Sequence, residues 1–162
     1  MNITIITTGG TIDKVYFDAK SDYAVGDPQI RSILDRVGST LSYVVIDLFH
    51  KDSLDLTAED REKIVEAAAA SDTDQIVITH GTDSMVETAL ALISVARSKT
   101  IVLVGSLTPA RFRETDAEFN IGVAVGAVQS LPPGVYLAMN GRIFDPEKVR
   151  KNRGKNRFED SE

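Results

Sequence analysis

Five short apolar runs rich in β-branched residues alternate with helix-like segments, and this alternation restricts the fold more than any other feature of the sequence. Each run is five or six residues long, a length that suits strands buried on both faces. They lie at residues 3–7, 43–48, 75–79, 100–104 and 135–139. Strands that alternate with helices are joined by right-handed crossovers into a mainly parallel sheet. The sequence therefore predicts an α/β fold, a doubly wound sheet with helices on both faces.

The helix-like segments have an apolar face and, in the first of them, clear start signals. They span residues 57–71, 84–98 and 117–130. In the first, Thr57 is a suitable N-cap, acidic residues follow it, and Ile64 and Ala68 share one face. Neither an internal repeat nor a linker divides the sequence. We therefore expect one domain over residues 1–155 and a polar, solvated tail over residues 156–162.

Composition and charge exclude several classes of protein. The chain has 162 residues, of which 43% are hydrophobic, enough for a sizeable core. Its formal net charge of −6 disfavours a nucleic-acid binder, and it has no cysteine and only two histidines, His50 and His80, for a metal site. Met1 leads directly into a strand-like run, and no apolar run is long enough for a membrane span. We expect a soluble cytoplasmic protein without a metal ion and without nucleic-acid or membrane partners.

Polar loops follow the first four predicted strands. They read TTGGT, HKDSLD, THGTDS and GSLTP, and together they contain hydroxyls, carboxylates and a lysine. In open α/β sheets, ligands bind beyond the carboxyl ends of the strands, so these loops are expected along one edge of the sheet. Such a set of side chains can carry acyl-transfer chemistry.

Taken singly, each loop also has a simpler interpretation. The Gly9–Gly10 pair is compatible with a turn that needs positive φ, and Asp83 with the N-terminal cap of the next helix. His80 ends a buried strand, where a hydrogen-bonded structural histidine is more common than a base. The glycines fit neither the dinucleotide-binding pattern nor the phosphate-binding loop of nucleotide hydrolases.

Read together, five motifs resemble one enzyme family. TTGGTID, SDYAVG, DSLDLT, THGTDS and VRK occur in the order and at the spacing of the bacterial-type L-asparaginases, over residues 3–155. The chain is similar only to the larger N-terminal domain of those enzymes, which implies a single-domain, short-chain asparaginase. The resemblance implies hydrolysis of L-asparagine to L-aspartate and ammonia through an acyl-enzyme, with no cofactor, in a homo-oligomer of two or more chains.

The same motifs assign site residues by resemblance. The catalytic set is a nucleophilic threonine, a tyrosine on a loop over the site, and a second threonine with an aspartate and a lysine: Thr11, Tyr23, Thr82, Asp83 and Lys151. The substrate-binding set is Gly10, Asp52, Ser53, Gly81 and Ser106. Leu54 departs from the glutamine that some members have next to the serine.

The base for the nucleophile stays open at this point. A threonine hydroxyl needs a base to remove its proton as it attacks the amide carbon. Tyr23 is one candidate, and Lys151 is the other, although Asp83 would favour the charged form of the lysine.

Two other functions also stay open. One is a related amidase, either a glutaminase or the amide-hydrolysing subunit of a transamidation complex, and the other is a non-enzymatic amino-acid-binding module. In two-domain members, acidic groups from the smaller domain of a neighbouring subunit contact the α-ammonium group of the substrate. Because no such domain occurs in this sequence, we expect weak discrimination against succinamic acid, which lacks only that group.

Overall fold

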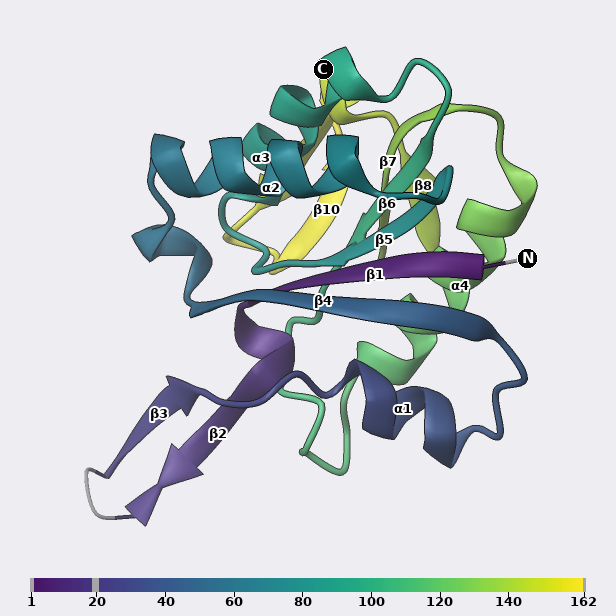
Figure 1. The fold of residues 1–162 in the computed structure, drawn as a ribbon. Coiled ribbons are helices and arrows are strands. Elements are labelled where there is room, and N and C mark those ends of the chain that lie inside the picture. Colours follow the sequence, from purple (N-terminus) through teal and green to yellow (C-terminus); the bar gives the residue numbers. More distant parts are fainter. Residues whose placement is uncertain (1, 19–20, 162) are drawn as a thin grey trace.

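The computed structural model describes residues 2–18 and 21–161 and has a six-stranded sheet at its centre (Figure 1). The strand order is β4-β1-β5-β6-β7-β8. The strands are β1 (Asn2–Gly9), β4 (Ser42–Lys51), β5 (Gln75–Thr79), β6 (Thr100–Val104), β7 (Gly134–Met139) and β8 (Arg142–Phe144). The first five pair in parallel, and β8 pairs antiparallel with β7. All five predicted strands are in this sheet, and its mainly parallel arrangement is confirmed.

Helices cover both faces of the sheet, as a doubly wound fold requires. They are α1 (Ile30–Arg36), α2 (Ala58–Ala70), α3 (Met85–Leu92) and α4 (Ala117–Ser130). The helices α2 and α3 lie on one face, and α1 and α4 lie on the other (Figure 1). Along β1, Ile3 and Ile5 are buried with α1 and α4, whereas Ile6 is buried with α2 and α3. The alternation of side chains along a strand thus produces two apolar cores.

The predicted helices are present with one change of length. The helix α2 begins after Thr57, whose hydroxyl accepts a hydrogen bond from Asp60 N–H at 3.2 Å while the Asp60 carboxylate accepts one from Thr57 N–H at 3.0 Å. The helix predicted at residues 84–98 is shorter, because α3 ends at Leu92 and continues as a 3₁₀ turn, Ile93–Val95. None of the helices in the described ranges is both long and apolar enough to cross a membrane.

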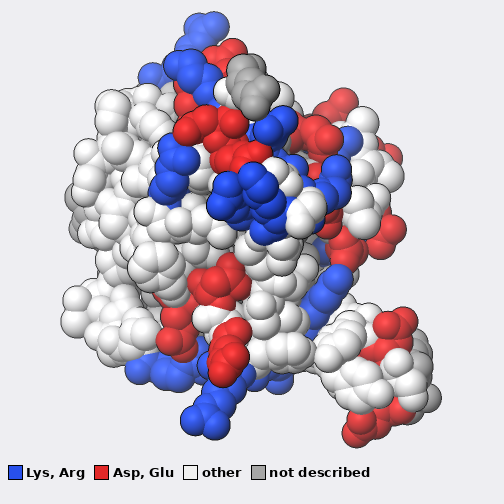
Figure 2. Space-filling view, turned by 180° about the vertical axis from the view of Figure 1, so that it is seen from behind, with Lys and Arg blue, Asp and Glu red and all other residues white. Residues whose placement is uncertain are grey.

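An antiparallel hairpin stands out from the body of the protein and carries Tyr23. It consists of β2 (Lys14–Phe17) and β3 (Asp22–Val25), which pair only with each other (Figure 1). Figure 2 shows the same hairpin at the lower right of the opposite view, with carboxylates on its surface. The hairpin leaves directly from the 3₁₀ turn that contains Thr11, so the two residues are connected by a short chain segment.

A second hairpin corrects the expected polar tail. It pairs β9 (Val149–Asn152) with β10 (Arg157–Asp160). Phe158 is 3% exposed and packs in the core on the α2 and α3 side. Residues 157–160 are therefore a strand and not part of a solvated tail, because one apolar side chain among charged neighbours anchors them.

Candidate active site

Three of the polar loops touch through glycines at the carboxyl end of the sheet. A Cβ on Gly10 would overlap the backbone of Gly81, and a Cβ on Gly81 would lie 2.5 Å from the Cβ of Ser53. Neither position has room for a side chain, so only glycine fits. The backbone N–H of Gly10 also donates to the Lys51 carbonyl at 2.9 Å. These contacts bring together the TTGGT, DSLDLT and THGTDS loops.

Lys151 forms a hydrogen-bonded cluster with two predicted site residues. Its Nζ donates to Thr82 Oγ1 at 2.8 Å and to Asp83 Oδ1 at 2.9 Å. Thr82 is buried, and the Lys151 side chain is 12% exposed. Burial by itself would raise the pKa of Asp83, but the hydrogen bonds and charges of Lys151 and Arg153 hold that pKa below its ordinary value. Asp83 is therefore ionised at neutral pH and paired with cations.

Ser53 links the second and third loops. Its hydroxyl accepts a hydrogen bond from Asp83 N–H at 3.2 Å, and its carbonyl accepts one from the Ser84 hydroxyl at 2.6 Å. Ser53 is itself buried. The backbone at Asp83, just before α3, is thus held in place by a neighbouring loop.

A hollow of about 300 Å³ lies at the TTGGT and GSLTP loops. It is lined by Thr11, Lys14, Tyr23, Pro109 and Phe112. The Tyr23 ring centroid lies 5.3 Å from that of Tyr16 and 6.0 Å from that of Phe112. The ring therefore packs against Tyr16 of its own hairpin and against Phe112, just after the GSLTP loop. Tyr23 remains 46% exposed. Thr11 and Tyr23 therefore line a shared space that a small ligand can enter.

Asp52 lines a second hollow, of about 410 Å³, which also includes Lys14 and Tyr23. Its Oδ2 lies 2.6 Å from Lys14 Nζ, and its Oδ1 accepts a hydrogen bond from Leu54 N–H at 3.2 Å. Burial would raise the pKa of Asp52, but the bonds from Lys14 and Leu54 lower it below its ordinary value. The carboxylate is thus already paired with Lys14.

Ser106 forms its side-chain hydrogen bond within its own loop. It is buried, and its hydroxyl donates to the carbonyl of Thr108 at 2.6 Å, within the GSLTP loop. It is not among the lining residues of either hollow described above. The assignment of Ser106 to substrate binding stays a prediction.

Both histidines have partners. His80 is fully buried, with Nδ1 2.7 Å from the Gly81 carbonyl oxygen and Nε2 2.9 Å from the Thr88 hydroxyl. Burial lowers the pKa of His80 to about 4, so the ring is neutral at pH 7. These contacts agree with the structural interpretation of His80. His50 Nε2 lies 2.8 Å from Asp47 Oδ2, a partner that the sequence did not indicate.

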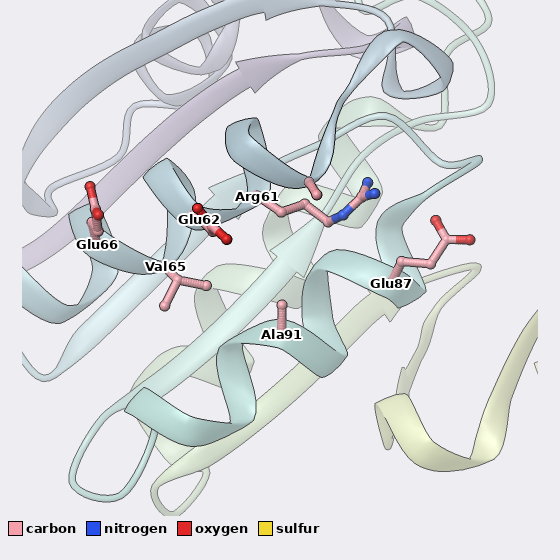
Figure 3. A pocket seen from close by; sticks show the side chains of 7 residues that line it. Arg61, Glu62, Val65, Glu66, Glu87 and Ala91 are labelled. Atoms are coloured by element: carbon pink, nitrogen blue, oxygen red, sulfur yellow. The ribbon is translucent and has the colours of Figure 1, made fainter.

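A larger hollow, of about 510 Å³, lies between α2 and α3 (Figure 3). Side chains from both helices surround it, including Arg61 and Glu62 from α2 and Glu87 and Ala91 from α3. No serine or threonine is among its lining residues, and none of them belongs to the four polar loops. The volume of a hollow therefore does not identify the site, and the four polar loops remain the candidate site.

Sequence reasoning missed three residues near the site: Lys14, Phe112 and Arg153. Lys14 pairs with Asp52, Phe112 packs on Tyr23, and Arg153 pairs with Asp83. Arg153 lies in the turn directly after β9, so strand alternation does not place it on the same face as Lys151. The contact between Phe112 and Tyr23 depends on how two distant loops pack, and no local pattern encodes it.

The comparisons with known proteins point to one family. The family model described as "Asparaginase, N-terminal" matches residues 2–159. The chain belongs to the asparaginase family. The resemblance read from the five motifs is confirmed, and the matched asparaginase region includes nearly all of the sheet and both hairpins.

Individual members of the asparaginase family agree with this assignment. The probable periplasmic L-asparaginase of Haemophilus influenzae is 34% identical over 160 residues, which cover 93% of this chain and 46% of that protein. L-asparaginase 2 of Escherichia coli is 33% identical over 161 residues, covering 93% of this chain and 46% of its own length. The structure of the thermostable L-asparaginase from Thermococcus kodakarensis aligns with a TM-score of 0.84 at 29% identity, over 99% of this chain and 51% of that chain. The chain thus spans about half the length of the asparaginases that it matches.

Asp13, two residues after Thr11, carries a buried carboxyl with one bonded oxygen. Its Oδ1 accepts a hydrogen bond from Gln29 N–H at 2.8 Å, and its Oδ2 has no hydrogen-bond partner within the described residues. Burial raises the pKa of Asp13 to about 7, against the opposing effect of the Gln29 bond; His50, Asp47 and Arg111 contribute smaller charge effects. The folded protein therefore keeps a proton that the unfolded chain loses near pH 4.

We expect Asp13→Asn to stabilise the protein at pH 8 and to change little at pH 4. The wild-type carboxyl lowers stability progressively between about pH 4 and pH 7, because the unfolded chain binds fewer protons there. The full effect is at most about 4 kcal/mol above pH 7. Urea unfolding of both proteins at the two pH values measures it.

The exposed Asp35→Asn serves as the control for charge removal. His80 contributes a slope of opposite sign, because its lowered pKa makes stability rise with pH between about 4 and 6.5. Only the difference between variant and wild type therefore isolates Asp13. An Asp13→Asn protein with the wild-type pH dependence would show that the carboxyl ionises freely in the folded state.

Proposed function

We propose that this chain hydrolyses the side-chain amide of L-asparagine to L-aspartate and ammonia, with Thr11 as nucleophile. The observation that carries the proposal is the Thr82–Lys151–Asp83 cluster, in which Lys151 Nζ lies less than 3 Å from each partner oxygen. Thr82 and Asp83 belong to the loop that meets the Thr11 loop through Gly81 and Gly10. Membership of the asparaginase family supports the same chemistry.

In the proposed first step, the Thr11 hydroxyl attacks the amide carbon while a base removes its proton. Tyr23 is the proposed base, because it lines the same hollow as Thr11, whereas the Lys151 ammonium is held by Asp83. Backbone N–H groups near Thr11 and Thr82 would stabilise the oxyanion by about 3 kcal/mol for each donor. The base then returns the proton to the amide nitrogen as the C–N bond breaks, which releases ammonia and leaves an ester on Thr11. Water then hydrolyses this ester to L-aspartate.

The experiment that tests the function is ammonia release by the purified chain from L-asparagine, L-glutamine and D-asparagine. We expect the fastest release from L-asparagine. A clear preference for glutamine would favour the related amidase, and no release with any substrate, together with measurable L-aspartate binding, would favour the binding module.

We expect Lys151→Met to lower kcat for L-asparagine about 100-fold or more, with a smaller change in KM, because positioned proton-transfer groups contribute on this scale. Methionine keeps the length of the side chain but cannot donate to Thr82. The control is Lys148→Met, on the same C-terminal segment, whose ammonium is exposed and paired with Asp145 at 3.2 Å. An unchanged kcat in the Lys151 variant would remove Lys151 from the catalytic set.

We also propose that the chain works as a homo-oligomer in the cytoplasm, binding only a small-molecule substrate. The family resemblance supports this, since members have their sites at subunit interfaces. The Tyr16, Phe17 and Tyr23 side chains, exposed on the projecting hairpin, are suited to contact with a second chain. Sedimentation at assay concentration tests it, and an active monomer would contradict it.

A further inference from the structure

The Asp83 carboxylate is shared by two cations. Lys151 Nζ lies 2.9 Å from Asp83 Oδ1, and Arg153 Nε lies 3.2 Å from the same oxygen. The Nη2 of Arg153 also lies 3.5 Å from the Asp83 carbonyl oxygen. The two cations differ in exposure, since the Arg153 side chain is 68% exposed and the Lys151 side chain 12%. Lys151 thus approaches from inside the protein, and Arg153 covers the carboxylate from the solvent side.

The charge at this point does not suit an ammonium ligand. One carboxylate faces two cations, which leaves the Asp83 group with a local excess of one positive charge. Asp52, the other predicted carboxylate of the site, is paired with Lys14 at 2.6 Å. An α-ammonium group that approaches Asp83 would therefore have to displace Arg153 or bind beside it against charge repulsion. A carboxylate of the substrate meets no such opposition.

Two other arginines of the same hairpin also form ion pairs with a carboxylate. Basic side chains lie interleaved with carboxylates over the upper part of the view in Figure 2. On β9 and β10, Arg150 and Arg157 both pair with Glu159, at 3.0 and 3.4 Å. Arg153 differs from these two neighbours because its partner is a predicted catalytic residue. Arg153 therefore adds a positive charge at the candidate site, whereas Arg150 and Arg157 pair with a carboxylate on the strands of the hairpin.

We propose that Arg153 determines specificity by occupying Asp83, so that the site accepts side-chain amides of carboxylic acids whether or not they carry a free α-ammonium group. Succinamic acid and N-acylated asparagine are members of the class without that group. The inference rests on the proposed amidase function for its kinetic consequence, but the competition for Asp83 is a property of binding. Arg153 can be displaced, because most of its side chain is exposed and exposed ion pairs are weak. The result is a site that accepts L-asparagine with a raised KM and discriminates little against succinamic acid.

The test compares two substrates that differ only in the α-ammonium group. In Arg153→Ala, kcat/KM for L-asparagine relative to succinamic acid should rise about ten-fold, since one charge-assisted contact to Asp83 becomes available. The gain should appear in KM rather than in kcat. Loss of attraction for the carboxylate affects both substrates alike and cancels in the ratio. Arg153→Lys should restore most of the wild-type ratio.

Arg157→Ala is the matched control, because it removes an arginine of the same hairpin that pairs with Glu159 and not with Asp83. It should leave the ratio unchanged. An unchanged ratio in Arg153→Ala, or an equal change in Arg157→Ala, overturns the proposal.

A binding experiment separates this inference from the proposed function. L-aspartate and succinate again differ only in the ammonium group, and calorimetry measures both without turnover. Arg153→Ala should tighten L-aspartate relative to succinate by about ten-fold. If this tightening occurs in a chain that releases no ammonia, the role of Arg153 is retained and the amidase function is rejected. If the chain releases ammonia but the binding ratio is unchanged, the amidase function is retained and the role of Arg153 is rejected.

Discussion

Thr11→Ala is expected to remove nearly all ammonia release from L-asparagine, by about 1,000-fold or more in kcat, while L-aspartate binding stays measurable. The variant lacks the oxygen that forms the proposed ester. The change should not disturb the fold, because Thr11 lies at the first position of a 3₁₀ turn and is partly exposed. Steady-state ammonia release and aspartate calorimetry on the same preparation measure the two effects.

Two variants control this result. Thr11→Ser keeps a hydroxyl and should retain measurable turnover, whereas Ser106→Ala should matter much less than Thr11→Ala, since the Ser106 hydroxyl bonds within its own loop. Near-normal turnover in Thr11→Ala would refute the assignment. Thr82, the other threonine of the site, would then become the better candidate.

Gly10→Ala is expected to destabilise the fold by about 4 kcal/mol and to abolish activity with it. Gly10 has φ of +92°, a region that L side chains rarely adopt, and a Cβ there would overlap the backbone of Gly81. Backbone cannot rotate aside as a flexible side chain can, so the two loops must separate. Urea unfolding with an activity assay tests both parts of this expectation.

The control is Gly126→Ala in the middle of α4. No atom lies within 4 Å of a Cβ at Gly126, and its φ is helical. The same chemical change should there stabilise the protein by about 0.5–1 kcal/mol. A Gly10→Ala protein as stable as wild type would mean that the contact between the two loops is not required.

The strands and loops could be predicted from the sequence because each has a local cause. Buried parallel strands read as continuous β-branched runs, and all five runs are strands of the sheet. The order of strands and helices then puts the polar loops at one edge, which is why Thr11, Ser53 and Thr82 come from loops that meet. The Gly-Gly pair was also informative, although its partner at Gly81 was not foreseeable.

The parts that could not be predicted depend on packing between distant segments. Phe158 is one apolar residue in a charged stretch, so its burial and the strand around it had no periodic signal. The burial of Asp13 and the contact of Arg153 with Asp83 likewise require the folded arrangement of several elements. A sequence pattern identifies which residue types are available, but it does not decide which of them find a partner.

The different attachment of the two halves of the site has a consequence for motion. β1, which leads into Thr11, is bonded on both sides by β4 and β5, whereas the hairpin that carries Tyr23 has only its own two strands. Amide hydrogens of β1 should therefore exchange only through the largest opening events, and those of β2 and β3 through small local ones. Local opening of the hairpin should therefore leave the position of Thr11 unchanged. Access to Thr11, which depends on the hairpin, and the rigidity of the central sheet are therefore separate properties that can change independently.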